Sequence, residues 1–273
     1  MLKDLAPALR FLTIIPLPGG GRLLSEREIT RSAAAFVLVG LLQGALLLAV
    51  HWAASLFLTP DLGRWLVVLT LTLIGGGFHL DGLADSFDAL GVKSCGDRER
   101  DRVRRLEVMK DSATGAMGMM AIFFALIFKF SALQNLALVA SPPVYALVLL
   151  LFPALGKWAM LLAMYQGTPA RPDGLGRLFI GAVGGRELAW GGATLALPIL
   201  FFAWSPAAKL PSYYHLFLML LLPLALLSAS RMMVALARRR FGGITGDSLG
   251  AINEISEIIS LLLVIVWLQL SVW

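Results

Sequence analysis

The sequence is poor in cysteine and in charge. Its single cysteine, Cys95, excludes an internal disulfide and a metal centre built from several thiolates. Charged residues make up only 15% of the 273 residues, while 58% are hydrophobic and the mean hydropathy is +0.81. This composition excludes an ordinary soluble domain and indicates an integral membrane protein.

Long apolar runs occupy most of the chain. Several reach about 20 residues, the length that a helix needs to cross the hydrocarbon core. Because a helix satisfies its own backbone hydrogen bonds in lipid, we predict an all-α, polytopic membrane helix bundle. No repeat or soluble second domain is evident, so residues 1–273 are predicted to form one integral-membrane catalytic domain. About seven spans are predicted: 32–58, 64–78, a third ending near 138, 142–165, 188–204, 213–237 and 249–270.

The basic residues predict the orientation of this bundle. With seven spans, and with Arg231 assigned to the connection at the end of the sixth, 19 of the 23 Lys and Arg residues fall on one side of the membrane and two on the other. The remaining two, Lys129 and Lys157, lie within spans. The positive-inside rule therefore places the N-terminus in the cytoplasm and the C-terminus outside. Segment 1–31 is then cytoplasmic or interfacial, and segment 79–113 is an acidic and basic cytoplasmic loop. The net charge of +6 could suggest a nucleic-acid partner, but the basic residues are distributed according to the membrane sides. We therefore expect no nucleic-acid partner.

Three carboxylates follow the second predicted span. On a helix of about 100° per residue, Asp81, Asp85 and Asp88 lie within roughly 60° of one another. Three anions this close repel one another unless protons or a cation neutralise them, and an all-oxygen cluster suits a hard ion such as Mg²⁺. The alternative is a solvated helix with scattered acids.

A second acidic face is predicted at the start of the last span. Asp247, Glu254 and Glu257 lie within about 80° of one another there, and carboxylates inside a span call for a partner unless the interface solvates them. Asp247 is also a candidate helix N-cap, as are Asp111 and Ser112.

Two lysines inside predicted spans and one histidine next to the acids also require an interpretation. Lys157, inside the fourth span, either extends its side chain to water or neutralises a phosphate. Lys129 lacks acidic neighbours in the sequence, so we interpret it as extending to water. His79 precedes the first acidic helix and is a candidate for orienting a carboxylate or transferring a proton, although a lone histidine is commonly structural.

These polar segments are all predicted on the cytoplasmic side. Carboxylates that hold Mg²⁺, basic groups and glycine-rich backbone together suit transfer of a phosphate-linked group. The flanking glycines permit close backbone approach to a ligand, or close packing of spans. The segments concerned are 79–88, 110–114, 174–181 and 245–257.

The same segments resemble the signature blocks of the cobalamin-5'-phosphate synthase family, the adenosylcobinamide-GDP ribazoletransferases. The resemblance covers nearly the whole chain in the right order, and the His-Leu-Asp-Gly-Leu-Ala-Asp block is its most specific part. The matching residues are 11–13 with Pro16 and Pro18, 76–88 (GGFHLDGLADSFD), 109–112 (MKDS) with Gly115 and Gly118, 174–181 (GLGRLFIG), and 243–251 (GITGDSLGA) with Glu254 and Glu257.

This resemblance implies a multi-pass, Mg²⁺-dependent enzyme of the cell inner membrane, with its active site facing the cytoplasm. The reaction joins adenosylcobinamide-GDP to α-ribazole or its 5'-phosphate and releases GMP, late in cobalamin assembly. Partners beyond substrates and the lipid bilayer would be a second copy of the chain or other cobalamin-assembly enzymes.

The resemblance also implies roles for individual residues. Asp88 or Glu254 would accept the proton of the attacking hydroxyl. The implied metal ligands are Asp81, Asp85, Asp88 and Asp111, and the catalytic set is Asp81, Asp85, Asp88 and Glu254. The implied substrate-binding residues are His79, Lys110, Ser112, Lys157, Thr245, Asp247, Asn253 and Glu257.

The chain departs from the family pattern at four positions. Arg is common in relatives where this sequence has Ile14, Ala113 and Lys157, and Gly is common where it has Ala89. Because Lys cannot reproduce the bidentate fork of Arg, these departures bear on the phosphate contacts.

Two alternatives are an enzyme of related chemistry and a protein of another class. A CDP-alcohol phosphotransferase of lipid synthesis carries an Asp-x-x-Asp-Gly-x-x-Ala-Arg pattern, whereas here Gly82 follows Asp81 directly and no Ala-Arg follows. An ion-coupled transporter is expected to show inverted repeats and acids near the midplane, whereas these acids cluster at one face.

Overall fold

The structure is a computed structural model that describes residues 2–17, 24–204 and 217–270. The described residues form helices and connecting loops without a strand, which confirms the predicted all-α fold. The elements are α1 Leu2–Leu12, α2 Glu26–Ser32, the 3₁₀ helix η1 Ala33–Ala35, α3 Phe36–Ser55, α4 Pro60–Ile74, α5 Phe78–Gly91, α6 Arg98–Val108, α7 Ala116–Val139, α8 Pro142–Gln166, the 3₁₀ helix η2 Leu175–Leu178, α9 Gly185–Trp204, the π-helix η3 Phe217–Leu221, α11 Leu222–Phe241 and α12 Gly246–Leu270.

Within residues 2–17, 24–204 and 217–270, four helical segments are long and apolar enough to cross a membrane. They are Glu26–Ser55, in which η1 joins α2 to α3, together with α7, α8 and α12. The pair α4 and α5 also qualifies when taken together, but the two helices are bent by 84° at the glycines between them. Helices α9 and α11 overlap the fifth and sixth predicted spans, although residues 213–216 of the sixth lie outside the described residues. The exact count of seven and the orientation stay predictions.

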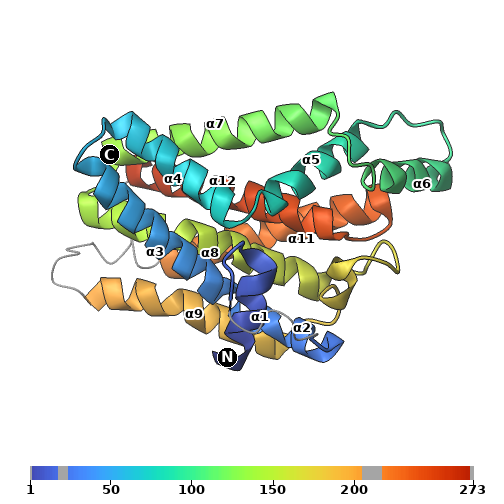
Figure 1. The fold of residues 1–273 in the computed structure, drawn as a ribbon, viewed down its shortest axis with the longest axis horizontal. Helices are drawn as coiled ribbons and strands as arrows, with labels where there is room; N and C mark the ends of the chain where they lie inside the picture. Colours follow the sequence, from blue (N-terminus) through green and yellow to red (C-terminus); the bar gives the residue numbers. More distant parts are fainter. Residues whose placement is uncertain (1, 18–23, 205–216, 271–273) are drawn as a thin grey trace.

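Helix α8 forms the centre of the bundle and is buried along most of its length (Figure 1). It packs against α3, α9, α11 and α12. Gly40 and Gly44 of α3 face it directly, and a Cβ atom on Gly44 would lie only 2.1 Å from the carbonyl oxygen of Leu150. The small residues therefore let two helix backbones touch, as is typical of membrane helix pairs.

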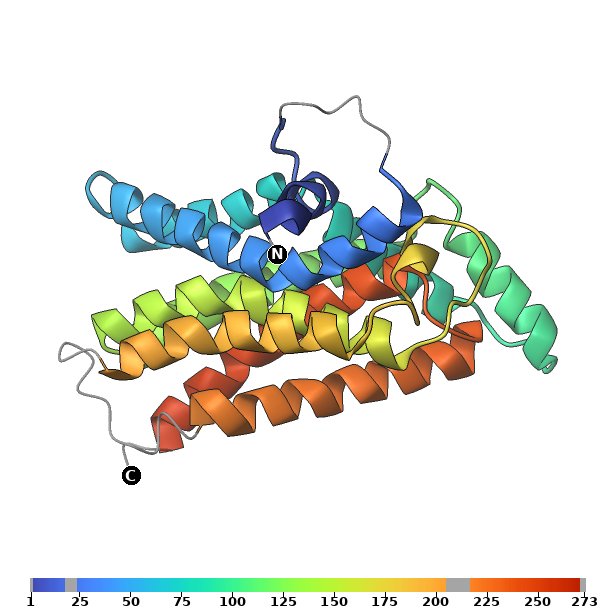
Figure 2. The same cartoon turned by 90° about the horizontal axis from the view of Figure 1, so that it is seen from below.

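Most of the predicted cytoplasmic segments lie at one end of the bundle. Figures 1 and 2 place α6, η2 and the connection from α11 to α12 at the end opposite the turn between α3 and α4. Within the charged stretch 91–112, residues Arg98–Val108 form helix α6, and not all of its charged side chains are solvated. Asp101 and Arg105 of α6 are buried: Asp101 accepts hydrogen bonds from the Ser94 hydroxyl and the Cys95 N–H, and Arg105 donates to the carbonyls of Val92 and Arg240.

Candidate active site

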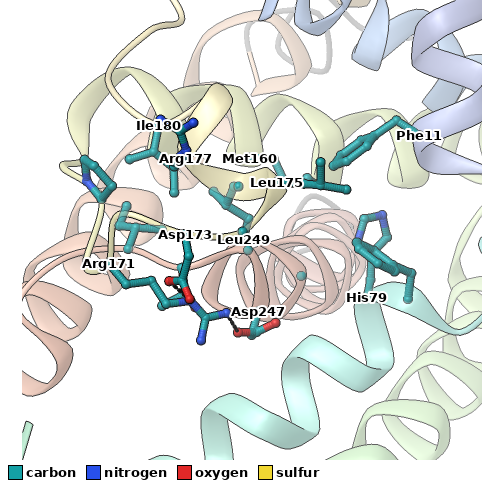
Figure 3. Close-up of a pocket in the computed structure, with 18 residues that line it drawn as sticks. Phe11, His79, Met160, Arg171, Asp173, Leu175, Arg177, Ile180, Asp247 and Leu249 are labelled. Carbon is teal, nitrogen blue, oxygen red and sulfur yellow. Dashed lines mark hydrogen bonds and ion pairs between the residues drawn. The ribbon is translucent and has the colours of Figure 1, made fainter. Parts of the chain in front are cut away.

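A cavity of about 170 Å³ lies at this end of the bundle. Its walls come from α1, the start of α5, the loop between α8 and η2, and the start of α12. Figure 3 shows Arg171, Asp173 and Asp247 grouped on one side of the cavity, with His79 and Phe11 on the other. Segments that are far apart in the sequence therefore meet, as predicted for 79–88, 174–181 and 245–257.

Backbone contacts fix the loop that forms the charged wall. Ala170 N–H donates to the Ile244 carbonyl at 2.9 Å, and Ile244 N–H donates to the Thr168 carbonyl at 2.8 Å. Further along, Gly176 lies against the first turn of α12, where a Cβ atom would come within 2.8 Å of the Gly246 nitrogen. The loop is thus held to the start of α12 at both of its ends.

Arg171 is the central group of the charged wall. Its Nη2 lies 3.2 Å from Oδ2 of Asp247, and its Nε lies 3.7 Å from Oδ1 of Asp173. Its buried Nη1 has no hydrogen-bond partner among the described residues. A buried donor without a partner is unfavourable by about 1 to 3 kcal/mol, so this atom is available to a ligand.

Lys110 extends the same ionic chain towards solvent. Its Nζ lies 2.6 Å from Oδ2 of Asp173, and both side chains are about half exposed. The hydrogen bond from Lys110 lowers the pKa of Asp173 below its ordinary value. Sequence reasoning identified Lys110 and Asp247 but missed Arg171 and Asp173, which lie between them.

His79 lies on the opposite wall of the cavity. It is buried, and neither ring nitrogen has a hydrogen-bond partner in the described part of the chain. Gly250 of α12 packs against its backbone, with a hypothetical Cβ atom 3.1 Å from the His79 carbonyl oxygen. The imidazole therefore faces the cavity with its hydrogen-bonding capacity unused.

The acidic residues of α5 lie beside the cavity and are not part of its lining. Asp81 is exposed and Asp85 is partly buried, and the charges of Asp81, Asp247 and Asp88 all act on the Asp85 carboxylate. The two helices touch at Gly82, where a Cβ atom would lie 2.7 Å from the Asp247 carbonyl oxygen. Close contact at Gly82 thus brings the α5 carboxylates to the first turn of α12.

Asp88 performs a structural task at the start of α7. Its two oxygens accept hydrogen bonds from Gly115 N–H at 2.7 Å and from Gly118 N–H at 2.8 Å. Asp88 therefore caps the N-terminus of α7, a role for which Asp111 and Ser112 were the candidates in the sequence. Asp111 instead accepts from Ala113 N–H at 3.0 Å in the preceding loop, where it and Ser112 are exposed.

Thr245 caps α12, a role that we considered for Asp247. The Thr245 hydroxyl oxygen accepts from Ser248 N–H at 3.0 Å, which is the usual N-cap arrangement. Asp247 is consequently free to turn towards Arg171.

The remaining predicted site residues form a buried network deeper in the bundle. Lys129 of α7 donates to Glu254 at 2.7 Å and to Glu257 at 2.6 Å, so the interpretation that Lys129 extends to water is wrong. Lys157 of α8 donates to Asn253 at 2.9 Å and lies 3.8 Å from Glu257. All five side chains are buried, and none of them lines the cavity.

The carboxylates suit a metal by their chemistry, although they are not gathered around one point. Among the described residues, no three His, Cys, Asp or Glu side chains are arranged so that they could hold an ion. The oxygen donors of Asp81, Asp85 and Asp247 nevertheless match the preference of Mg²⁺, and their mutual repulsion favours a cation between them. By donor chemistry alone this set suits the predicted ion, and the Mg²⁺ site stays a prediction.

Comparisons with known proteins identify the family. A family model described as cobalamin-5-phosphate synthase matches residues 4–265. Proteins named adenosylcobinamide-GDP ribazoletransferase are similar to the chain: one from Thermodesulfovibrio yellowstonii is 32% identical, covering 96% of this chain and 95% of its own length. One from Herpetosiphon aurantiacus is 35% identical (97% and 96%), and one from Citrobacter koseri is 38% identical (93% and 96%). No solved structure matches the chain. The chain therefore belongs to the cobalamin-5-phosphate synthase family.

Proposed function

We propose that the protein is an adenosylcobinamide-GDP ribazoletransferase, which joins adenosylcobinamide-GDP to α-ribazole or its 5'-phosphate and releases GMP. The observation that carries this assignment is the cavity at the end of the bundle, in which three of the family-like segments meet around Arg171. The relatives named above support this transferase, and none of them is named as a lipid phosphotransferase or a transporter.

The two sides of the cavity suit the two parts of such a substrate. Arg171 offers a charged donor to a diphosphate, and the first turn of α12 adds the positive end of a helix dipole. Phe11, Leu175 and Ile180 provide apolar surface for a base or sugar. A volume of 170 Å³ is smaller than the roughly 300 to 1,000 Å³ typical of ligand pockets, so the corrin ring stays outside.

His79 is the group that we propose for proton transfer. The ribazole hydroxyl attacks the cobinamide-side phosphorus, its proton passes to an imidazole nitrogen, and the bond from that phosphorus to the GMP oxygen breaks as GMP leaves. The unpartnered nitrogens of His79 on the cavity wall support this role. The earlier candidates are less available, because Asp88 binds two backbone N–H groups and Glu254 binds Lys129.

Mg²⁺ is part of this proposal. Asp81, Asp85 and Asp247 would hold the ion, which would offset the negative charge of the diphosphate and of departing GMP. We also propose that the membrane is the inner membrane and that the cavity faces the cytoplasm, since the Lys and Arg distribution supports that side. Association with a second copy or with other enzymes of the pathway stays a prediction.

The experiment uses purified full-length protein in detergent with adenosylcobinamide-GDP and α-ribazole. GMP release is expected with Mg²⁺ and is expected to stop when EDTA removes the ion. Arg171→Gln and His79→Ala are expected to reduce GMP release, whereas Lys93→Gln, a change in the exposed loop before α6, leaves it unchanged. Absence of GMP from the unaltered protein, under conditions where the Citrobacter koseri relative releases it, would disprove the assignment.

A further inference from the structure

The charged wall of the cavity contains one carboxylate that lies between two cations. Asp173 is 2.6 Å from Lys110 Nζ through one oxygen and 3.7 Å from Arg171 Nε through the other. The three residues come from two different loops, one before α7 and one after α8. Asp173 is thus the group that joins the two loops across the edge of the cavity.

The contacts on the two sides of Asp173 are not equally good. The 3.7 Å separation from Arg171 exceeds hydrogen-bond length, and Nη1 of the same guanidinium has no partner among the residues described. Asp247, by contrast, holds Nη2 at 3.2 Å and orients the group from the other side. Arg171 is therefore positioned by Asp247 while part of its donor capacity remains unused.

The size of the cavity adds a second observation. At about 170 Å³ it is smaller than the roughly 300 to 1,000 Å³ typical of ligand pockets, which favours an outward movement of the wall when a nucleotide binds. Asp173 is about half exposed and lies in a loop that contains Pro169, Pro172 and a Gly174 of φ +86°. Breaking the Lys110 contact frees the loop from Lys110, and breaking the Arg171 contact frees the Asp173 carboxylate from the guanidinium.

We propose that Asp173 is an internal substitute for substrate phosphate: its carboxylate occupies the space between Lys110 and Arg171 and is displaced when a nucleoside diphosphate binds there. The proposal rests on the proposed function for the identity of the diphosphate. Phosphate oxygens then take over both cations, and Arg171 keeps Asp247 as its orienting partner. Lys110, Arg171 and Asp173 together set the affinity for the anionic part of the substrate.

A substitute anion weakens binding by competition, and this gives the proposal its test. Binding of GDP is measured by titration calorimetry on the full chain in detergent with Mg²⁺ present. Asp173→Asn keeps the shape and removes the charge, so GDP should bind about two- to fivefold more tightly, in line with the strength of an exposed ion pair. Arg171→Gln should weaken binding about tenfold or more, because a charge-assisted hydrogen bond is lost.

The double variant separates competition from a general effect. In the Arg171→Gln background, Asp173→Asn should raise the GDP affinity by less than half as much as it does in the unaltered protein. The reason is that one of the two cations that Asp173 would release is absent. The matched control is Asp61→Asn, which likewise removes the charge of an aspartate paired with an arginine. Asp61 lies 2.7 Å from Arg64 on α4, and its substitution should leave the GDP affinity unchanged. Asp173→Ser serves as a second variant, and thermal unfolding midpoints show that each protein is folded.

Two results would overturn the proposal: weaker GDP binding in both Asp173 variants, or affinities in both that equal that of the unaltered protein. The proposed function fails by a different result, the absence of GMP release from adenosylcobinamide-GDP by the unaltered protein. If GMP release is absent while Asp173→Asn still tightens GDP binding, the phosphate site stands without the transferase assignment.

Discussion

At the scale of single residues, the buried charges of the bundle depend on one another. Lys129 contacts both Glu254 and Glu257, so Lys129→Met leaves two buried carboxylates whose remaining contacts are with Lys157 and the Asn253 amide. Loss of one partner of a buried ion pair destabilises a protein by roughly 3 to 5 kcal/mol. We expect a clearly lower thermal unfolding midpoint in detergent.

Charge balance, rather than the lysine side chain itself, should explain this loss. The double variant Lys129→Met, Glu254→Gln restores the balance and is expected to recover part of the unfolding midpoint. Lys93→Met, in the exposed loop before α6, is the matched control and should leave the midpoint unchanged. An unfolding midpoint for Lys129→Met equal to that of the control would contradict the account.

Asp88 allows a test of capping against metal binding. Asp88→Ala removes the acceptor of two backbone N–H groups at the start of α7, which is expected to destabilise the protein by about 0.5 to 2 kcal/mol. Hydrogen exchange of the first turn of α7 should become faster. Asp88→Asn retains one acceptor oxygen, so its stability and its rate of exchange should lie between those of the unaltered protein and of Asp88→Ala.

The Mg²⁺ dependence of GMP release separates the two roles of Asp88. If capping is its main role, Asp88→Asn keeps the Mg²⁺ concentration needed for half-maximal rate, whereas Asp85→Asn raises it. A rise of similar size for both variants would show that Asp88 also contacts the ion.

The sequence predicted some site residues and missed others for identifiable reasons. Asp81, Asp85 and Asp247 were found because carboxylates at helical spacing form a local pattern. Arg171 and Asp173 lie in a Gly- and Pro-containing connection without periodicity, so nothing marked them. Lys129 was misinterpreted because its partners are more than 100 positions away, on a helix whose rotation a single sequence does not specify.

At the scale of elements, the contact between α5 and α12 depends on a missing side chain. A Cβ atom at position 82 would lie 2.7 Å from the Asp247 carbonyl oxygen, which is a rigid backbone atom. Gly82→Ala is therefore expected to push α5 away from α12 and to destabilise the protein by about 1 to 3 kcal/mol. GMP release should fall further than the unfolding midpoint suggests, because the Asp81 and Asp85 carboxylates move with α5.

Gly63→Ala in α4 is the matched control, since its nearest neighbour would be the Ala54 Cβ atom at an ordinary 3.4 Å. It should keep both stability and activity. If Gly82→Ala behaved in the same way, the close approach of α5 and α12 would not matter for the site.

The positions of the helices were predictable, but the bend between α4 and α5 was not. Apolar length alone placed segments near the observed α3, α7, α8 and α12. In the sequence the acidic helix follows the second predicted span, 64–78, directly, and nothing there indicates that the chain turns by 84° between the two helices. Gly76 and Gly77 adopt φ +64° and +72°, a left-handed conformation that glycine adopts readily and that ends α4.

At the scale of the whole molecule, Cys95 provides a natural probe of orientation. It is the single cysteine of the sequence and is exposed in the loop between α5 and α6, at the end of the bundle that carries the cavity. A membrane-impermeant maleimide is expected to label it in inside-out vesicles and not in intact spheroplasts. Ser141→Cys in a Cys95→Ser background, between α7 and α8, should show the reverse pattern.

Labelling of Cys95 in intact spheroplasts would contradict the predicted orientation.

The sequence did not predict which helices pack against each other, such as α8 between α3 and α12. Apolar runs specify which segments enter lipid and not which of their faces meet.

The buried network also constrains how the chain is assembled in the membrane. Lys129 and Lys157 lie near the middle of α7 and α8, which are synthesised before α12 supplies Glu254 and Glu257. An unpaired lysine at the bilayer centre is unfavourable by about 2.5 to 3.5 kcal/mol on insertion scales. Until residues 254 and 257 have been synthesised, Lys129 and Lys157 therefore lack these counter-ions, and α12 completes the buried network only after α7 and α8 have left the ribosome.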